Sequence, residues 1–195
     1  MWRAGCGRDR RELRAVSDGD RRRWDERYAT VGLADPAPPQ PLRGREDLLP
    51  GSGRALDVAC GRGAAAVWLA ERGLTVDAVD VSPAGLAAAA ELAAARGVTG
   101  VRWWQHDLDT GLPPECRGRY DVVVCERFRD PTLYPALAAA LAPGGLLAVT
   151  VLSQVGGSAG EFRAPPGELR SAFGGLTVLH HAEADGLASL LATRP

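Results

Sequence analysis

The chain has 195 residues, a formal net charge of −1 and a hydrophobic fraction of 46%. This length holds one domain of ordinary size with a full core, and the near-neutral charge gives no electrostatic reason to bind nucleic acid or a membrane surface. We find no apolar run suited to a signal peptide or a membrane span. We therefore expect a cytoplasmic protein, a monomer or homodimer, that acts on a small molecule.

The four cysteines are scattered along the chain, at Cys6, Cys60, Cys116 and Cys125. They form no CxxC pair and have no histidine at the spacing of metal ligands, so the sequence indicates neither a disulfide framework nor a zinc site. We expect free thiols and no bound metal.

The first 53 residues have little regular patterning. Residues 1–16 are rich in Arg and Gly without apolar periodicity and are expected to be disordered. A short amphipathic helix follows, in which Trp24 and Tyr28 are four residues apart and share one face. A Pro-rich extended connector comes next, so residues 17–53 are expected to form a helical lid and connector within a single domain that spans 17–195.

From residue 54 onward, short apolar runs alternate with Ala/Leu-rich helical segments. This alternation is typical of a parallel sheet with helices on both faces. Near the end, Asp185-Gly186 favours a type I′ turn between two strands. The sequence predicts an α/β fold, a doubly wound Rossmann-like seven-stranded sheet with an antiparallel last strand. We expect strands at 55–59, 75–80, 101–106, 120–125 and 145–151, and helices at 64–72, 83–96 and 133–141.

The first of these strands ends in a Gly61-x-Gly63 turn that opens directly into a helix, which allows a ligand to approach the main chain. With Ala66, the turn also satisfies the dinucleotide fingerprint, and Asp80 lies where that fingerprint expects a ribose-binding acid. Asp57, inside the strand, distinguishes a dinucleotide from a cationic nucleotide-like ligand. Its carboxylate suits a cationic ligand and would repel a pyrophosphate.

The segment LDVACGRG, with its acidic strand and glycine-rich exit, resembles motif I of class I S-adenosylmethionine-dependent methyltransferases. The resemblance implies that S-adenosylmethionine is the cofactor. It also implies that Asp57, Ala59 and the Gly61 to Gly63 backbone lie against the methionine end. Asp80 ends the next strand and is expected to bind both ribose hydroxyls.

The same resemblance extends to the later strands. It implies that Val81 and Leu108 lie against the adenine and that Asp107 receives its amino group. The residues after the fourth strand should face the transferable methyl group, because open α/β sheets bind ligands at the carboxyl ends of their strands. These residues are Cys125, which we expect to contact the cofactor, and the following Glu126, Arg127 and Phe128.

A narrower resemblance comes from the two ends of the chain. WDERYA and the late FRAPPGEL segment are similar to the tellurite-resistance methyltransferases and their thiopurine-like relatives. That family implies an early helix closed over the cofactor, with Arg27 near the methionine carboxylate and Tyr28 near the substrate. The expected reaction is methyl transfer to a small molecule, with a thiol or a selenium or tellurium oxyanion as the favoured acceptor.

The chemistry leaves several readings open. A soft acceptor needs no base once it is ionised, whereas an oxygen or nitrogen acceptor would recruit Glu126 or His106. An ordinary loop carboxylate is an equally good interpretation of Glu126. Two other functions also remain, an NAD(P)-binding Rossmann reductase and a non-catalytic protein that binds the adenosyl cofactor. Asp57, Asp107 and the terminal hairpin disfavour the reductase.

Overall fold

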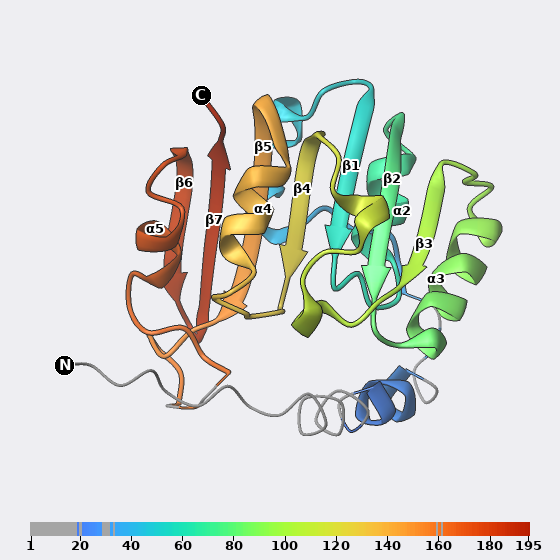
Figure 1. Ribbon diagram of the computed structural model, residues 1–195, viewed down its shortest axis with the longest axis horizontal. Helices are drawn as coiled ribbons and strands as arrows, with labels where there is room; N and C mark the ends of the chain where they lie inside the picture. Colours follow the sequence, from blue (N-terminus) through green and yellow to red (C-terminus); the bar gives the residue numbers. More distant parts are fainter. Residues whose placement is uncertain (1–18, 20, 29–31, 33, 159, 161) are drawn as a thin grey trace.

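The computed structural model describes residues 19, 21–28, 32, 34–158, 160 and 162–195. The expectations for residues 1–16, including Cys6, lie outside these residues. Within the described part of the chain, seven strands form one sheet in the order β3-β2-β1-β4-β5-β7-β6 (Figure 1). Their bounds are β1 Gly53–Val58, β2 Leu74–Asp80, β3 Val101–Gln105, β4 Tyr120–Glu126, β5 Leu141–Leu152, β6 Thr177–Ala184 and β7 Leu187–Thr193.

The pairing of the strands confirms the doubly wound topology. Strands β1 to β5 pair in parallel, and β7 inserts antiparallel between β5 and β6. The turn between β6 and β7 has positive φ at both central residues, 52° at Asp185 and 75° at Gly186, as the predicted type I′ turn requires. The chain order reverses between β1 and β4, and open α/β sheets bind ligands at such a switch point.

Four α-helices accompany the sheet in the described residues, α2 (Ala64–Ala70), α3 (Pro83–Ala95), α4 (Tyr134–Ala140) and α5 (Glu168–Ala172). Residues 21–28, which we call the N-terminal helix, are also helical. The 3₁₀ turns are η1 (Gln40–Leu42), η2 (Glu46–Leu48), η3 (Leu108–Thr110) and η4 (Pro114–Cys116). None of the helices in the described residues combines the length and apolar character of a membrane span.

The expected elements are present with small shifts of their ends. The largest shift is in β5, which begins at Leu141 and not at residue 145 because Leu141 already pairs with Tyr120 of β4 before an irregularity in the register. The expected helix at 133–141 is correspondingly shorter. Within the connector, Glu46–Leu48 form the single 3₁₀ turn η2.

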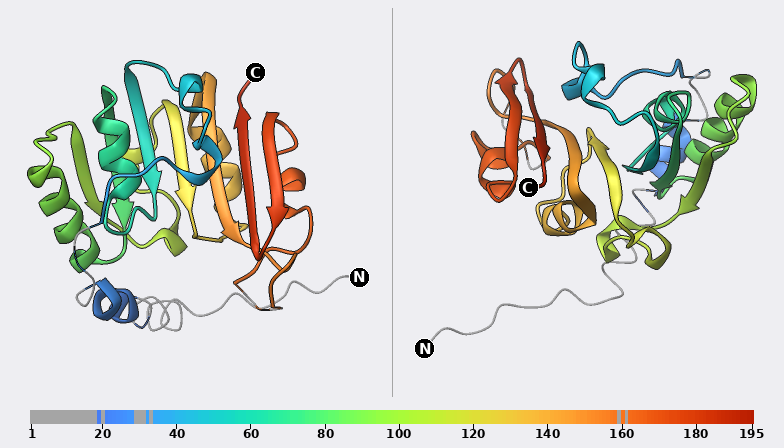
Figure 2. Two further views of the ribbon diagram at one scale, coloured as in Figure 1. Left: turned by 180° about the vertical axis from the view of Figure 1, so that it is seen from behind. Right: turned by 90° about the horizontal axis from the view of Figure 1, so that it is seen from above.

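Two apolar layers enclose the sheet (Figure 2). One contains η1 and α2, and α3 packs beside α2; the other contains α4 and α5. Alternate residues of β4 enter opposite layers, with Val122 and Val124 in the first and Val123 and Cys125 in the second. Burial on both faces explains why the parallel strands read as near-continuous apolar runs.

A buried carboxylate ties four strands together. Asp77 of β2 is 1% exposed and accepts hydrogen bonds from Arg54 (3.1 Å), Arg102 (2.8 Å), Trp104 (2.9 Å) and Tyr120 (2.9 Å). Burial by itself raises the pKa of Asp77, but these hydrogen bonds outweigh burial and hold the pKa below its ordinary value.

Candidate functional site

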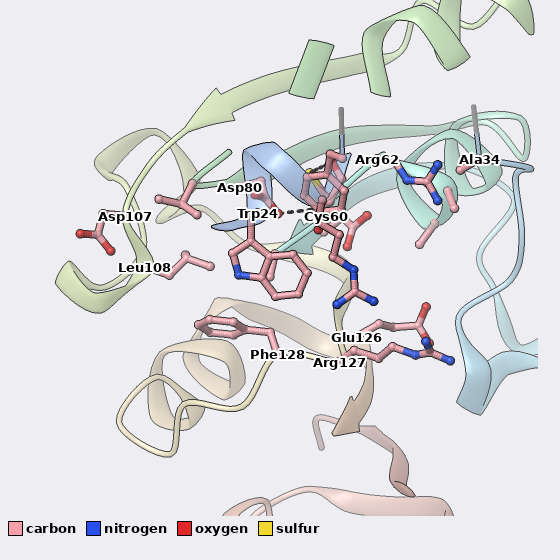
Figure 3. A pocket seen from close by; sticks show the side chains of 18 of the residues that line it. Trp24, Ala34, Cys60, Arg62, Asp80, Asp107, Leu108, Glu126, Arg127 and Phe128 are labelled. Carbon is pink, nitrogen blue, oxygen red and sulfur yellow. Dashed lines mark hydrogen bonds between the residues drawn. The ribbon is translucent and has the colours of Figure 1, made fainter. Parts of the chain in front are cut away.

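A cavity of about 460 Å³ opens at the carboxyl ends of β1, β2 and β4 and is bordered by the N-terminal helix (Figure 3). Its size is that of a typical small-molecule site. In Figure 3, Asp107 and Leu108 lie at one end and Glu126 and Arg127 at the other, with Trp24 and Phe128 between them. Ten of the twelve residues that the sequence assigns to the site line it: Arg27, Tyr28, Asp57, Ala59, Gly61, Asp80, Val81, Asp107, Leu108 and Glu126.

The turn after β1 places main chain against the cavity. Ala59 and Gly61 both line it and have positive φ, 56° and 53°. A left-handed conformation costs a residue with a side chain about 1–2 kcal/mol, and such strain gathers at functional sites. A Cβ at Gly61 would lie 2.8 Å from the Tyr28 hydroxyl oxygen, so the ring of Tyr28 can cover this turn only because position 61 has no side chain.

Gly63 has a different role from the one expected. It does not line the cavity but precedes α2 with φ 75°. A Cβ at this position would lie 2.7 Å from the Cβ of Ala89 in α3 and 3.0 Å from the ring of Trp103. This glycine therefore lets α2 pack closely against α3 and β3.

Asp57 is the least satisfied carboxylate at the site. It is 2% exposed, it borders the cavity, and its Oδ2 has no hydrogen-bond partner. Burial raises the pKa of Asp57 well above its ordinary value, and the nearby carboxylates of Glu126 and Asp80 raise it further. A buried carboxylate in this state is stabilised by a cation.

Asp80, at the end of β2, is held in a fixed orientation. Its Oδ2 accepts a hydrogen bond from the backbone N–H of Gly61 (2.8 Å) and its Oδ1 accepts one from that of Ser82 (2.9 Å). Burial nevertheless raises the pKa of Asp80. Each carboxylate oxygen has further lone pairs, so both can still accept from a ligand that enters the cavity.

The next wall of the cavity follows β3. Asp107 caps the 3₁₀ turn η3, since its Oδ1 accepts from the backbone N–H of Asp109 (3.1 Å). Leu108 beside it is 5% exposed, and Val81 comes from the end of β2. His106 does not line the cavity: its Nε2 lies 3.1 Å from the carbonyl oxygen of Gly111 and bonds within its own loop.

At the end of β4, neighbouring side chains point in opposite directions. Cys125 is 1% exposed, belongs to the apolar layer of α4, and does not line the cavity, contrary to expectation. Alternation along the strand turns Glu126 the other way, into the cavity. There its Oε1 accepts from the backbone N–H of Gln40 (2.7 Å), which anchors the connector, and burial raises its pKa. Arg127 and Phe128 line the cavity as expected.

The N-terminal helix supplies the outer wall. Trp24 and Tyr28 stack with ring centroids 5.5 Å apart, which confirms their shared face, and the guanidinium of Arg27 lies 5.3 Å from the centroid of the Trp24 ring. Burial is the main cause that raises the pKa of the Tyr28 hydroxyl, and the carboxylate of Asp80 raises it further. The hydroxyl is therefore protonated at neutral pH.

Sequence reasoning missed several lining residues, among them Trp24, Cys60 and Arg62. Trp24 had a usable signal, its shared helical face with Tyr28. Arg62 lacked one, because it lies between the two glycines of the turn and reaches the cavity only through the folded course of the chain. Across the described residues, no three His, Cys, Asp or Glu side chains gather closely enough to hold a metal ion.

Comparisons with known proteins agree with this geometry. Residues 55–145 match the family model of a methyltransferase domain. Among curated proteins, the chain is 37% identical over 76 residues to a ribosomal protein L11 methyltransferase from Campylobacter fetus subsp. fetus. The match covers 39% of this chain and 26% of that protein, so the chain spans about a quarter of the length of this curated relative.

Three solved structures share the fold. TehB from Haemophilus influenzae has a TM-score of 0.69 at 16% identity, covering 90% of this chain and 67% of that one. The [4+2]-cyclase SpnF has a TM-score of 0.69 at 17% identity, and the match covers 92% of this chain and 96% of that one. Magnesium protoporphyrin IX methyltransferase from Synechocystis PCC 6803, with bound S-adenosylmethionine, has a TM-score of 0.60 at 18% identity. This match covers 98% of this chain and 87% of that one.

The strand order, the inserted antiparallel strand and the cavity at the switch point define a class I methyltransferase fold. Within it, residues 55–145 of this chain are the part that matches the methyltransferase-domain family. Because one of the three structural neighbours is a cyclase, the reaction has to be argued from the residues of the site.

Proposed function

We propose that the chain transfers the methyl group of S-adenosylmethionine to a small-molecule acceptor. The observation that carries the proposal is Asp57, a buried carboxylate with an unpartnered oxygen at the cavity wall. A second carboxylate, Glu126, borders the same cavity and interacts electrostatically with Asp57. Two carboxylates there attract an ammonium or sulfonium cation and repel a pyrophosphate, which favours the adenosyl cofactor over NAD(P).

The other lining residues fit the remaining parts of that cofactor. Asp80 would accept from the ribose hydroxyls, and Asp107 from the adenine amino group, with Val81 and Leu108 against the ring. Arg27 would reach the methionine carboxylate, since a guanidinium binds a carboxylate through two parallel hydrogen bonds. When bound, S-adenosylmethionine supplies an electrophilic methyl group on a sulfonium. The protein then has to orient the acceptor and exclude water.

We further propose that the acceptor is a soft nucleophile, such as a thiol or a selenium or tellurium oxyanion. Of the two residues considered as a base, His106 bonds within its own loop and does not line the cavity, and Glu126 anchors the connector through the N–H of Gln40, a structural role that accounts for its position without base chemistry. Tyr28, whose pKa is raised, would contact the acceptor without acting as a base. An acceptor that is ionised or polarisable by itself needs no base.

The cavity wall beside Glu126 suits such an acceptor. Arg127 and the aromatic rings of Trp24 and Phe128 line the cavity (Figure 3), and Arg27 lines it as well. With Arg27 assigned to the methionine carboxylate, the guanidinium of Arg127 would attract an anionic acceptor, and the rings would keep water from the reacting atoms.

The free thiols of the described residues support an assignment to the cytoplasm. Cys60, Cys116 and Cys125 form no disulfide. Disulfides are rare where glutathione and thioredoxin keep thiols reduced.

A transfer assay tests the proposed reaction. Protein would be incubated with isotopically labelled S-adenosylmethionine and one acceptor at a time, a simple thiol, selenite or tellurite. Products would be identified by mass spectrometry. We expect a labelled methylated product from at least one acceptor. The product should be absent with Asp80→Ala and present with Asp35→Ala, which removes an exposed carboxylate from the connector. Binding of the cofactor without transfer to any acceptor would indicate a non-catalytic adenosyl-binding protein.

A further inference from the structure

The N-terminal helix is attached to the first turn of α3 through one carboxylate. Oδ1 of Asp25 accepts a hydrogen bond from the hydroxyl of Ser82 and a second from the backbone N–H of Ala84, at 3.3 Å. Asp25 and Ser82 are 57 residues apart in the chain. Asp25 also lies at the N-terminus of a 13-residue helix, where a negative charge is stabilised by the helix dipole. We call these contacts the clasp.

Ser82 joins the clasp to the cofactor side of the site. Its side chain is fully buried, and its Oγ also accepts from the backbone N–H of Gly85, which caps α3 from within. Its own backbone N–H donates to Oδ1 of Asp80 at 2.9 Å. One residue therefore bridges two carboxylates, Asp80 in the wall of the cavity and Asp25 on the helix above it. Because α3 already has its own cap, the contact with Asp25 is additional.

The fit of Tyr28 reinforces the same attachment. Its ring lies against two glycines, and a Cβ added at either would collide with it, at 2.8 Å from the hydroxyl oxygen for Gly61 and 2.9 Å from Cδ2 for Gly85. Arg62, in the turn after β1, donates to the carbonyl oxygen of Gly32, a few residues beyond the helix. The helix is thus held by the same turn and helix that form the cofactor side of the cavity.

We propose that Asp25 is a positioning residue that holds the N-terminal helix over the cavity and, through Ser82, couples the position of this helix to occupancy of the site at Asp80. The coupling to an adenosyl ligand rests on the proposed function. The helix carries Trp24, Arg27 and Tyr28, so the clasp determines whether these side chains form the outer wall of the cavity. Coupling between two sites is reciprocal, so a ligand at Asp80 should stabilise the helix and loss of the clasp should weaken the ligand.

Hydrogen exchange measured by mass spectrometry on the full chain tests the clasp directly. Loss of the two hydrogen bonds in Asp25→Ala should accelerate exchange of the amides in residues 21–28 about tenfold in ligand-free protein. Asp25→Asn keeps an oxygen that accepts from both donors and loses only the charge at the helix N-terminus, so its exchange should lie much closer to wild type than to Asp25→Ala. Asp35→Ala is the charge-matched control and should also leave this segment unchanged. Equal exchange in Asp25→Ala and wild type would overturn the proposal.

Titration with S-adenosylhomocysteine tests the coupling. In the wild type, this ligand should slow exchange in residues 21–28, and its dissociation constant should rise about tenfold in Asp25→Ala, with recovery in Asp25→Asn. Urea unfolding should give Asp25→Ala and wild type similar global stability, which separates positioning from a general loss of structure. An unchanged dissociation constant in an Asp25→Ala protein whose helix exchanges faster would refute the coupling. Failure of every variant, the wild type included, to bind this ligand would refute the proposed function and the coupling together, while the ligand-free exchange still decides the clasp.

Discussion

At the scale of single residues, the buried carboxylate of Asp57 lowers the stability of the ligand-free protein when it is ionised, while the same charge favours binding of a cationic ligand. Burial, followed by the charges of Glu126 and Asp80, raises its folded-state pKa well above the ordinary value. Folding therefore favours the protonated form, and ionisation of Asp57 lowers the free energy of unfolding as the pH rises from the unfolded pKa of about 3.9 through the raised folded pKa. A cation bound beside Asp57 would remove this penalty.

Replacement of Asp57 should separate these two effects. Asp57→Asn removes the ionisation, so we expect the ligand-free variant to unfold at a higher temperature than wild type at pH values above the folded pKa. The same change should weaken binding of S-adenosylmethionine by about tenfold or more, which corresponds to one pKa unit of interaction. Thermal unfolding across a pH series and calorimetric titration give the two values. Unchanged cofactor affinity would show that Asp57 faces no cationic group.

Glu126 allows a test of whether the reaction uses a base. In Glu126→Gln, the amide oxygen can still accept from the N–H of Gln40, so the connector remains anchored. With a soft acceptor we expect kcat to stay within about threefold of wild type, whereas loss of a general base costs about 10²–10⁴-fold. The measurement is kcat with the best acceptor from the transfer assay. A fall of that larger size would assign the base to Glu126.

At the scale of secondary-structure elements, Asp77 connects β1, β2, β3 and β4. The side chains that donate to it come from the other three strands, so the carboxylate fixes their relative position. Its lowered pKa means that folding favours the ionised form. The resulting stability is fully present above the unfolded pKa of about 3.9 and is lost as the pH falls through the lower folded pKa.

Removal of Asp77 should therefore be costly. Asp77→Ala leaves the buried hydroxyl of Tyr120 and the half-buried indole N–H of Trp104 without this partner, and an unsatisfied buried donor costs about 1–3 kcal/mol. Urea unfolding at pH 7 measures this loss, with the exposed Asp47→Ala as the control that should change little. The difference between wild type and Asp77→Ala should shrink as the pH is lowered below the unfolded pKa. A pH-independent difference would show that packing, and not the charge, accounts for the loss.

The packing of α2 depends on Gly63. Gly63→Ala forces both a left-handed alanine and a close contact with Ala89, whereas Gly97→Ala, with φ 67° and open space around it, forces only the backbone strain. The strain itself costs about 1–2 kcal/mol. We expect Gly63→Ala to lower the free energy of unfolding by clearly more than Gly97→Ala in parallel urea titrations. Equal losses would mean that α2 and α3 adjust without cost.

At the scale of the whole molecule, the architecture followed from patterns that are local in the sequence. Apolar runs with intervening Ala/Leu segments predicted each central strand, and Asp185-Gly186 predicted the hairpin that places β7 antiparallel. The turn after β1, which lines the cavity, was also predictable, because a strand followed at once by a glycine turn and a helix has few alternative structures.

Tertiary contacts explain what the sequence did not predict. Gly63 satisfied a ligand-binding pattern but is required by the approach of α3, which depends on Ala89, 26 residues later. Cys125 was placed in the site because it ends a strand, whereas alternation along β4 turns it into the core and presents Glu126. The bond between Gln40 and Glu126 joins residues 86 apart, and no local pattern marks it. The roles of the lining residues stay predictions until variants are measured.

Calorimetric titration of wild type and Asp80→Ala with S-adenosylhomocysteine and with NADH is the most direct test that this cavity is an adenosyl-cofactor site. We predict saturable binding of S-adenosylhomocysteine to the wild type. Its affinity should fall at least about tenfold in Asp80→Ala, because the carboxylate of Asp80 accepts from the two ribose hydroxyls. NADH should not bind, because nearby Asp57 repels its pyrophosphate. Binding of NADH in place of S-adenosylhomocysteine, lost in the same variant, would contradict the account and assign the glycine turn to a dinucleotide.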